Sequence, residues 1–365
     1  MKRTGVILTA MIVCAALYCA SATAQSSLPF DPMAQRIVLA LAPEKGETAV
    51  LRYDPTVMPE LEKATRTRLE SRGVKVQSLA YGPAEKFEEL LARTDIYVWL
   101  PTQAGRAPEP DQAAALGRWL DVGRGRQIHF HWADGTRAVD GGNAAHNDAY
   151  DRAYLRALDV NYAELDRRME AAIQRMRSAE VRVTTPAGTD LRFRIGERPV
   201  TKQNGDASPA AMKRARVRID REIELPAGVL RVAPVEESVG GWMVIPRARI
   251  HGAVVEGIRL RFEKGVVQEI QATKNEAALR SYLPAGSVLR RFREFAVGLN
   301  LDLLTPRGSD AVAYYGYGSG VVRLSLGDNT ELGGNVRGGA VHWFFFPDAK
   351  VFIGSELLVN HVAKP

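Results

Sequence analysis

His129 and His131 are the first residues whose types and spacing allow chemistry. They lie two apart in the run 127–132, which is typical of a strand, and side chains two apart on a strand share a face. Two imidazoles on one face could bind a metal ion. No carboxylate pattern accompanies them in the sequence, so we expect packing or surface roles, with metal binding as the alternative.

Four segments of the second half hold a further group of candidates. Carboxylates and one histidine recur in a fixed order there: Glu236 in Pro234–Gly241, Glu294 in Arg293–Asn300, Asp328 before Gly333-Gly334, and His342 in Ala340–Trp343. Taken singly, these residues indicate little. The order of their local contexts is more informative.

Several catalytic classes lack their motifs. The chain has no Gly-x-Ser-x-Gly elbow and no His-Glu-x-x-His pair. No glycine-rich phosphate loop follows an expected strand, so we predict no nucleotide site. Cys14 and Cys19 are the only cysteines, and both lie in the N-terminal apolar segment, so the mature chain can form no disulfide and no thiolate site.

The N-terminal segment 1–24 reads as a signal peptide. Lys2 and Arg3 precede an apolar run from Val6 to Ala20, and Ala22-Thr23-Ala24 follows. This pattern predicts cleavage after Ala24 and a periplasmic or secreted protein. The run is too short for a comfortable membrane span, although an uncleaved anchor is the alternative.

The charge pattern argues against a nucleic-acid partner. The formal charge is +7, of which Lys2 and Arg3 leave with the signal peptide. Basic residues are interleaved with acidic ones, and no basic stripe is evident.

The first half alternates between strand-like and helical segments. We expect strands at 36–42, 49–53, 74–79, 95–100 and 127–132, and helices at 59–71, 85–92 and 111–120. Strands separated by helices of this length predict an α/β domain with a mostly parallel sheet, over 28–137. The polar segment that follows predicts a connection at 138–160.

The second half, 161–365, changes to a period of two after one long helix. Asn161 and Glu164 form a capping-box pattern, and the helix has one apolar face of Leu165, Met169, Ala172, Ile173 and Met176. Hairpins are expected at 181–195 and 258–270, with further strands at 242–245, 321–326, 340–346 and 351–353. We therefore predict a β-rich α+β second domain.

The ordered contexts resemble the thermophilic metalloaminopeptidase family, also called the aminopeptidase T family. The resemblance runs through most of the mature chain. It includes the hairpin Val181–Leu191, the segment Leu225–Glu236, the pattern Glu-x-x-x-Gly-x-Asn at Glu294, Gly298 and Asn300, and the segments 320–329 and 333–343. It implies a two-domain fold, a peptide substrate, and a homodimer by analogy.

The family holds two metal ions with two glutamates, two histidines and one aspartate, and such ligands suit zinc, cobalt or manganese. The resemblance assigns Glu236, Glu294 and His342 to matching ligand positions. Arg323 stands where the family has histidine, and Phe344 where it has aspartate. Thr330 lies near the place of a catalytic tyrosine.

These replacements have a direct physical meaning. Arginine is always charged and cannot ligate a metal. At position 323 it would place a fixed cation where a metal ion is expected, and it could pair with Glu236 or Glu294.

The resemblance therefore suggests an exported noncatalytic or impaired homologue that keeps a peptide-binding cleft and holds no metal. Two alternatives stay open. One is an active aminopeptidase with one zinc, cobalt or manganese ion at Glu236, Glu294 and His342. The other is a structural or partner-binding envelope protein.

Overall fold

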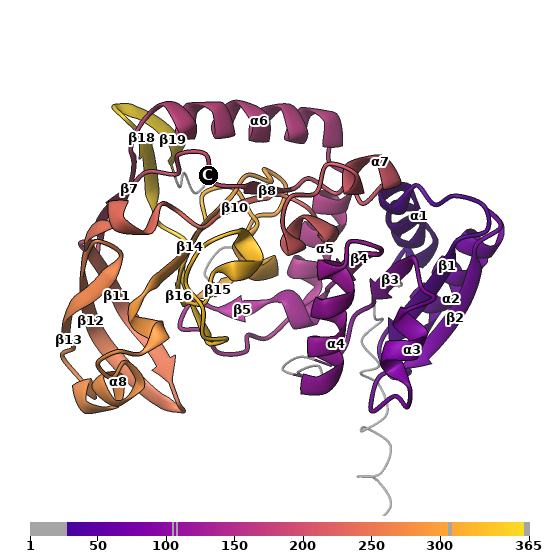
Figure 1. The fold of residues 1–365 in the computed structure, drawn as a ribbon, viewed down its shortest axis with the longest axis horizontal. Helices are drawn as coiled ribbons and strands as arrows, with labels where there is room; N and C mark the ends of the chain where they lie inside the picture. The colour runs from indigo at the N-terminus through magenta and orange to yellow at the C-terminus, as the bar shows by residue number, and fades with distance from the viewer. Residues whose placement is uncertain (1–27, 104–105, 107–108, 306–308, 361–365) are drawn as a thin grey trace, which may run out of the picture.

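A five-stranded parallel sheet forms the core of the first half of the chain (Figure 1). The computed structural model describes residues 28–103, 106, 109–305 and 309–360. The sheet order is β2-β1-β3-β4-β9, with strands β1 (Thr48–Tyr53), β2 (Lys75–Ala80), β3 (Ile96–Trp99), β4 (Arg126–Phe130) and β9 (Glu222–Leu225). The predicted parallel α/β arrangement is confirmed. The predicted signal peptide, residues 1–24, lies outside the described residues.

Helices accompany this sheet as the alternating pattern predicts. They are α1 (Phe30–Leu41), α2 (Pro59–Glu70), α3 (Phe87–Leu91) and α4 (Pro110–Asp121). One prediction fails here, because the segment 36–42 belongs almost entirely to α1 and not to a strand. Its buried residues Met33, Ala34, Ile37, Val38 and Leu41 follow helical spacing, and reading only the second half of that pattern makes it look like a short apolar strand.

The strand β9 joins this sheet although it lies far along the chain. It pairs in parallel with β4, and His129 stands opposite Glu224. The first sheet is therefore completed by a strand from the segment that we expected to belong wholly to the second domain.

Two antiparallel sheets make up the second half. The first has the order β17-β16-β14-β10-β8, with strands β8 (Val200–Gln203), β10 (Val229–Val232), β14 (Phe292–Gly298), β16 (Val322–Gly327) and β17 (Val341–Phe346). The second has the order β13-β12-β11-β7-β6-β18-β19, with β6 (Val181–Thr184), β7 (Asp190–Phe193), β11 (Gly240–Ile250), β12 (Ala253–Glu263), β13 (Val266–Gln271), β18 (Lys350–Ile353) and β19 (Glu356–Asn360). Both predicted hairpins are present, as β6–β7 and β12–β13.

A two-stranded ribbon and four further α-helices complete the described part of the fold. The ribbon pairs β5 (Arg137–Ala138) with β15 (Ala311–Val312). The helices are α5 (Asp148–Leu158), α6 (Tyr162–Ser178), α7 (Pro209–Met212) and α8 (Glu276–Tyr282). No helix in the described part of the chain is long and apolar enough to cross a membrane.

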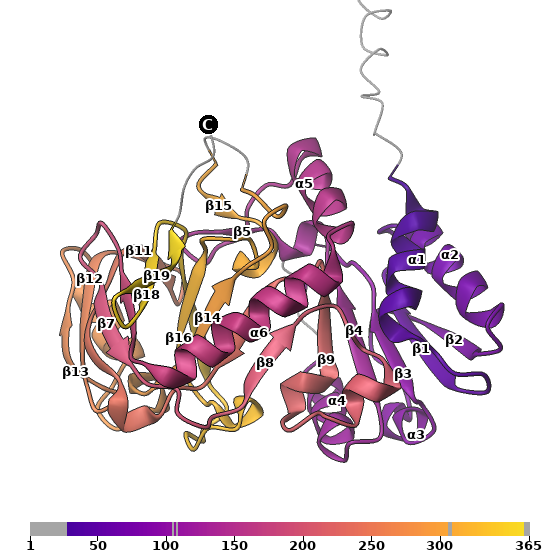
Figure 2. The same cartoon turned by 90° about the horizontal axis from the view of Figure 1, so that it is seen from above.

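The long helix α6 runs from the neighbourhood of α5 to the seven-stranded sheet, across the strands of the second half (Figures 1 and 2). The side chain of Asn161 accepts a hydrogen bond from the Glu164 amide at 3.0 Å, as the capping pattern predicts. All five predicted apolar positions of this helix are buried. Local patterning therefore sets both the start and the inward face of α6.

Candidate functional site

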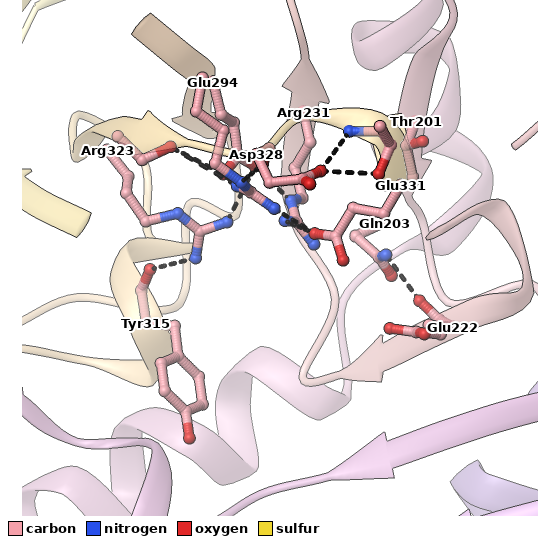
Figure 3. Close-up of polar contacts among 12 residues, drawn as sticks. Thr201, Gln203, Glu222, Arg231, Glu294, Tyr315, Arg323, Asp328 and Glu331 are labelled. Carbon is pink, nitrogen blue, oxygen red and sulfur yellow. Dashed lines mark hydrogen bonds and ion pairs between the residues drawn. The ribbon is translucent and has the colours of Figure 1, made fainter. Parts of the chain in front are cut away.

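Glu294 lies at the centre of a cluster of arginines on the five-stranded antiparallel sheet (Figure 3). Its side chain is fully buried and forms ion pairs with Arg231 of β10, Arg293 of β14 and Arg323 of β16. The distance from Arg323 Nη2 to Glu294 Oε1 is 3.2 Å. A β-bulge between Phe292 and Glu294 accounts for two consecutive residues of β14 reaching the same cluster.

The cluster fixes the charge of this carboxylate. Burial by itself disfavours the charged form of Glu294, but the three guanidinium groups outweigh it and hold its pKa well below the usual range. Glu331, in the 3-10 turn η6 (Thr330–Leu332), pairs with Arg231 and Arg293 at the edge of the cluster. The predicted pairing of Arg323 with one of the two glutamates is confirmed.

Arg323 also has aromatic neighbours. Its guanidinium lies 4.7 Å from the ring centre of Trp343 and 5.9 Å from that of Tyr317. Its Nη1 lies 3.5 Å from the Tyr315 carbonyl oxygen. The side chain is 3 % exposed, so this cation is held in place from several sides.

Glu236 belongs to a separate network. It begins the 3-10 turn η3 (Glu236–Ser238) and pairs with Arg198. It also accepts hydrogen bonds from the Asn329 side chain at 3.2 Å and the Asn335 amide at 2.8 Å. Burial opposes its charge, but these hydrogen bonds and Arg198 lower its pKa. No hydrogen bond or ion pair between described residues joins Glu236 to Glu294.

His342 does not share a face with Glu294, contrary to the predicted ligand group. Glu294 stands opposite Ser325, and Ser325 stands opposite Trp343. His342 is the neighbour of Trp343 in sequence, so its side chain points to the other face of the sheet. There its Nδ1 lies 3.0 Å from the Tyr282 hydroxyl.

Phe344 faces away from Glu294, and Thr330 lies next to the cluster residue Glu331 in η6. Phe344 is buried, stands opposite Leu324, and packs on the His342 ring at 4.5 Å between ring centres. Thr330 begins η6 and donates its hydroxyl to Asp328 at 2.6 Å. Neither residue therefore points to Glu294 as a metal ligand would. For Phe344 the cause is the strand register, which turns its side chain to the other face of the sheet.

The remaining part of the Glu-x-x-x-Gly-x-Asn pattern has a structural role. A Cβ atom on Gly298 would lie 2.0 Å from the Gly318 carbonyl oxygen. The Asn300 amide group donates to the carbonyl oxygens of Ala227 at 2.7 Å and Ala157 at 3.2 Å. This part of the pattern brings segments of the second half together.

A cavity of about 660 Å³ lies between the parallel sheet and the five-stranded antiparallel sheet. Residues from both sheets line it. From the first half come Trp99, Arg106, His129, His131, Asp134 and Arg137, and from the second Glu222, Glu224, Arg231, Tyr315, Arg323, Glu331 and Trp343. This cavity, and not the surroundings of Glu236 or His342, is the candidate functional site.

His129 of β4 and His131, directly after β4, face this cavity together with Glu224. One nitrogen of each ring and one carboxylate oxygen of Glu224 all lie within 4.8 Å of one another. Burial opposes the charge of His131, but Asp134 raises its pKa. Burial likewise opposes the charge of Glu224, but His129 lowers its pKa to about 2. The neighbouring Glu222 differs, because burial raises its pKa to about 7.

Sequence reasoning missed Glu224, Arg231 and Arg137 as site residues. The run 222–225 does alternate between acidic and apolar residues, which is a strand signal. Nothing in the local pattern, however, reveals that this strand pairs with β4. The sequence therefore showed two histidines without the carboxylate that lies opposite them.

Comparisons with known proteins agree with this two-part fold. The family model described as NicX: 2,5-dihydroxypyridine 5,6-dioxygenase matches residues 155–296, fewer than half of the chain. No curated protein matches the sequence.

Two solved structures are similar over nearly the whole chain. One is 2,5-dihydroxypyridine dioxygenase from Pseudomonas putida KT2440, with a TM-score of 0.62, 16 % identity, and coverage of 92 % of this chain and 97 % of that one. The other is wild-type AmpT from Thermus thermophilus, with a TM-score of 0.56, 16 % identity, and coverage of 88 % and 94 %. At this identity the likeness shows the fold. The resemblance to aminopeptidase T is thus a structural one, shared with a dioxygenase.

Proposed function

We propose that this chain is a non-hydrolytic homologue of the aminopeptidase T fold that binds a small organic carboxylate, such as a short peptide, between its two halves. The observation that carries the proposal is the arginine cluster around Glu294. The carboxylate which the family resemblance assigns to a metal ion is already neutralised by fixed cations.

The electrostatics of the cluster oppose a dinuclear centre at this place. A metal ion at Glu294 would have to displace charge-assisted hydrogen bonds from guanidinium groups, which are among the strong polar contacts of proteins. It would also approach three positive charges in a buried region, where such repulsion is poorly screened. Because His342 lies on the other face of the sheet, it cannot serve as a further ligand at this position.

The cavity offers a cation that is suited to a carboxylate. Arg137 lines the cavity and lies 5.2 Å above the Tyr315 ring. It donates to Asn143 at 2.9 Å and to the Tyr315 hydroxyl at 3.4 Å. Within the described chain it forms no ion pair, so its charge is available to an anion. Trp99, Tyr315 and Trp343 supply apolar surface nearby.

Calorimetric titration with the dipeptide Leu-Gly, and with its C-terminal amide as the matched ligand, tests this function. We expect the acid to bind and the amide to bind more weakly. Arg137→Met should weaken binding of the acid by about 10- to 100-fold, because a hydrogen bond to a charged group contributes about 1.5–3 kcal/mol. Arg106→Met is the matched control, since Arg106 lines the same cavity but is already paired with Asp54 at 3.0 Å.

A leucyl reporter assay with zinc, cobalt or manganese tests the non-hydrolytic part. We expect no cleavage above that of a Glu294→Gln variant. Metal-dependent cleavage that is lost in this variant, while circular dichroism shows the variant to be folded, would replace the proposal with the aminopeptidase alternative. Equal binding of Leu-Gly and its amide would refute the carboxylate-binding part.

A further inference from the structure

The cavity wall carries three potential metal ligands on, or directly after, two neighbouring parallel strands. His129 lies in β4, His131 follows directly after it, and Glu224 lies in β9 with its Cα paired to that of His129. The carboxyl ends of these strands open on the cavity. In α/β sheets, ligands bind at such carboxyl ends.

The spacing of the three side chains fits one ion better than a direct hydrogen bond. The distance from His129 Nδ1 to Glu224 Oε1 is 3.8 Å, which is longer than a hydrogen bond. Two atoms that each lie about 2.1 Å from one ion can be at most roughly 4.2 Å apart. The bound of 4.8 Å for the whole group exceeds that limit by about 0.6 Å, which small side-chain rotations can close.

Each of the three side chains is also oriented by a second contact. His131 Nδ1 lies 2.8 Å from Asp134 Oδ2, which fixes the proton on Nδ1 and leaves Nε2 as the lone-pair atom. His129 Nε2 contacts the Gln127 side-chain amide. With the amide oxygen turned toward the ring, Nε2–H donates to it and Nδ1 carries the lone pair that faces Glu224. The Tyr314 hydroxyl lies 3.2 Å from Glu224 Oε2. Metal-binding histidines and carboxylates characteristically have outer partners of this kind.

The charge balance distinguishes Glu224 from Glu294. Glu294 has three arginine partners. Glu224 is 14 % exposed, and its one ion-pair contact within the described residues is His129. Arg231 lines the same cavity but acts on Glu224 from beyond ion-pair distance. A metal ion would supply the direct charge partner that Glu294 already has.

We propose that His129, His131 and Glu224 bind one divalent transition-metal ion in this cavity. Two imidazoles and one carboxylate with open positions are the ligand set of mononuclear catalytic zinc sites and of non-haem iron(II) sites. The open positions face the space where the proposed carboxylate ligand binds. The site is independent of the proposed function, because it uses neither Arg137 nor the arginine cluster.

The test is metal titration of the untagged mature protein after chelator treatment, with Zn²⁺, Co²⁺ and, without oxygen, Fe²⁺. We expect one ion per chain, and a visible Co²⁺ spectrum that reports the ligand set. The variants His129→Ala, His131→Ala and Glu224→Gln should each lose stoichiometric binding. Zn²⁺ should bind more tightly than Fe²⁺, as the general order of divalent metal affinities requires.

Two kinds of variant make the outcome decisive. Asp134→Asn, a change to a positioning residue, should weaken metal affinity by about 10- to 100-fold and shift the Co²⁺ spectrum. Glu236→Gln and His342→Gln should bind the ion unchanged. The proposal is overturned if the protein binds no ion, if the ion remains in Glu224→Gln, or if it is lost in Glu236→Gln. Circular dichroism of each variant shows whether it is folded.

Discussion

Replacing Glu294 by glutamine should destabilise the protein more than replacing any single arginine around it. Formally, the cluster of Arg231, Arg293, Arg323, Glu294 and Glu331 carries a charge of +1. Glu294→Gln changes this to +2 in a buried place. Removing one partner of a buried ionic group costs about 3–5 kcal/mol, and we expect a loss in that range.

Arg323→Met has a milder expected effect because it leaves the cluster formally neutral. Arg231 and Arg293 still pair with Glu294. The loss is mainly one charge-assisted hydrogen bond of about 1.5–3 kcal/mol, offset in part by the new apolar side chain. The double variant again carries +1. Its cost should therefore be smaller than the sum of the two single costs, by at least about 1 kcal/mol.

The free energy of unfolding in urea, measured for the four proteins of this double-mutant cycle, checks the reasoning. Glu197→Gln is the surface control, since this side chain is 95 % exposed, and it should change stability by less than about 0.5 kcal/mol. The arginine partners of Glu294 also predict acid sensitivity, because they lower its folded pKa. A lowered folded pKa gives stability that is present above the unfolded pKa and is lost as the pH falls. A cost below about 1 kcal/mol for Glu294→Gln, or strict additivity in the cycle, would contradict the view that these charges act as one unit.

Three further outcomes follow from other parts of the molecule. Burial, and next the charge of His251, lower the pKa of His342 to about 4. As the pH falls, His342 is therefore protonated in the unfolded chain before it is protonated in the folded one, and about 3 kcal/mol of stability should be lost between about pH 6.5 and 4. In urea unfolding, the free energy of unfolding of His342→Asn should depend less on pH across this range. Gly298→Ala should lower stability by about 1–3 kcal/mol, because its Cβ would meet the Gly318 carbonyl oxygen; thermal unfolding tests this, and an unchanged melting temperature would exclude it. N-terminal sequencing of the exported protein should begin at Gln25, whereas a membrane-bound product beginning at Met1 would show that the segment is not cleaved.

Local patterns predicted those elements whose partners are close in sequence. The capped start and apolar face of α6 depend on residues within the helix itself, and the hairpin β6–β7 joins strands separated by a short turn. In such cases periodicity and turn residues contain most of the information. The misread segment 36–42 shows the limit, since a short apolar run fits a buried helix as well as a strand.

The candidate site was harder to predict because it depends on pairings between distant segments. Glu224 reaches His129 only through the parallel pairing of β9 with β4. Whether His342 faces Glu294 depends on a strand register in which a shift of one residue reverses the side-chain direction. Ligand positions inferred from motif order alone contain no information on that direction. The pairing of Arg323 with a glutamate was predicted correctly, because the motif in its own segment marks position 323 as a ligand position and the residue type itself shows the charge.

The late position of β9 has consequences for how the protein is made and how it can move. During synthesis, the open edge of β4 stays uncovered until residues 222–225 have left the ribosome, so a fragment ending before them would expose a hydrogen-bonding edge that invites aggregation. From β9 the chain continues after only a few residues into β10 of the other sheet. The two halves are thereby tied together beside the cavity itself. A wide hinge opening of the kind seen in many two-domain binding proteins is disfavoured, and a ligand enters through the existing mouth of the cavity.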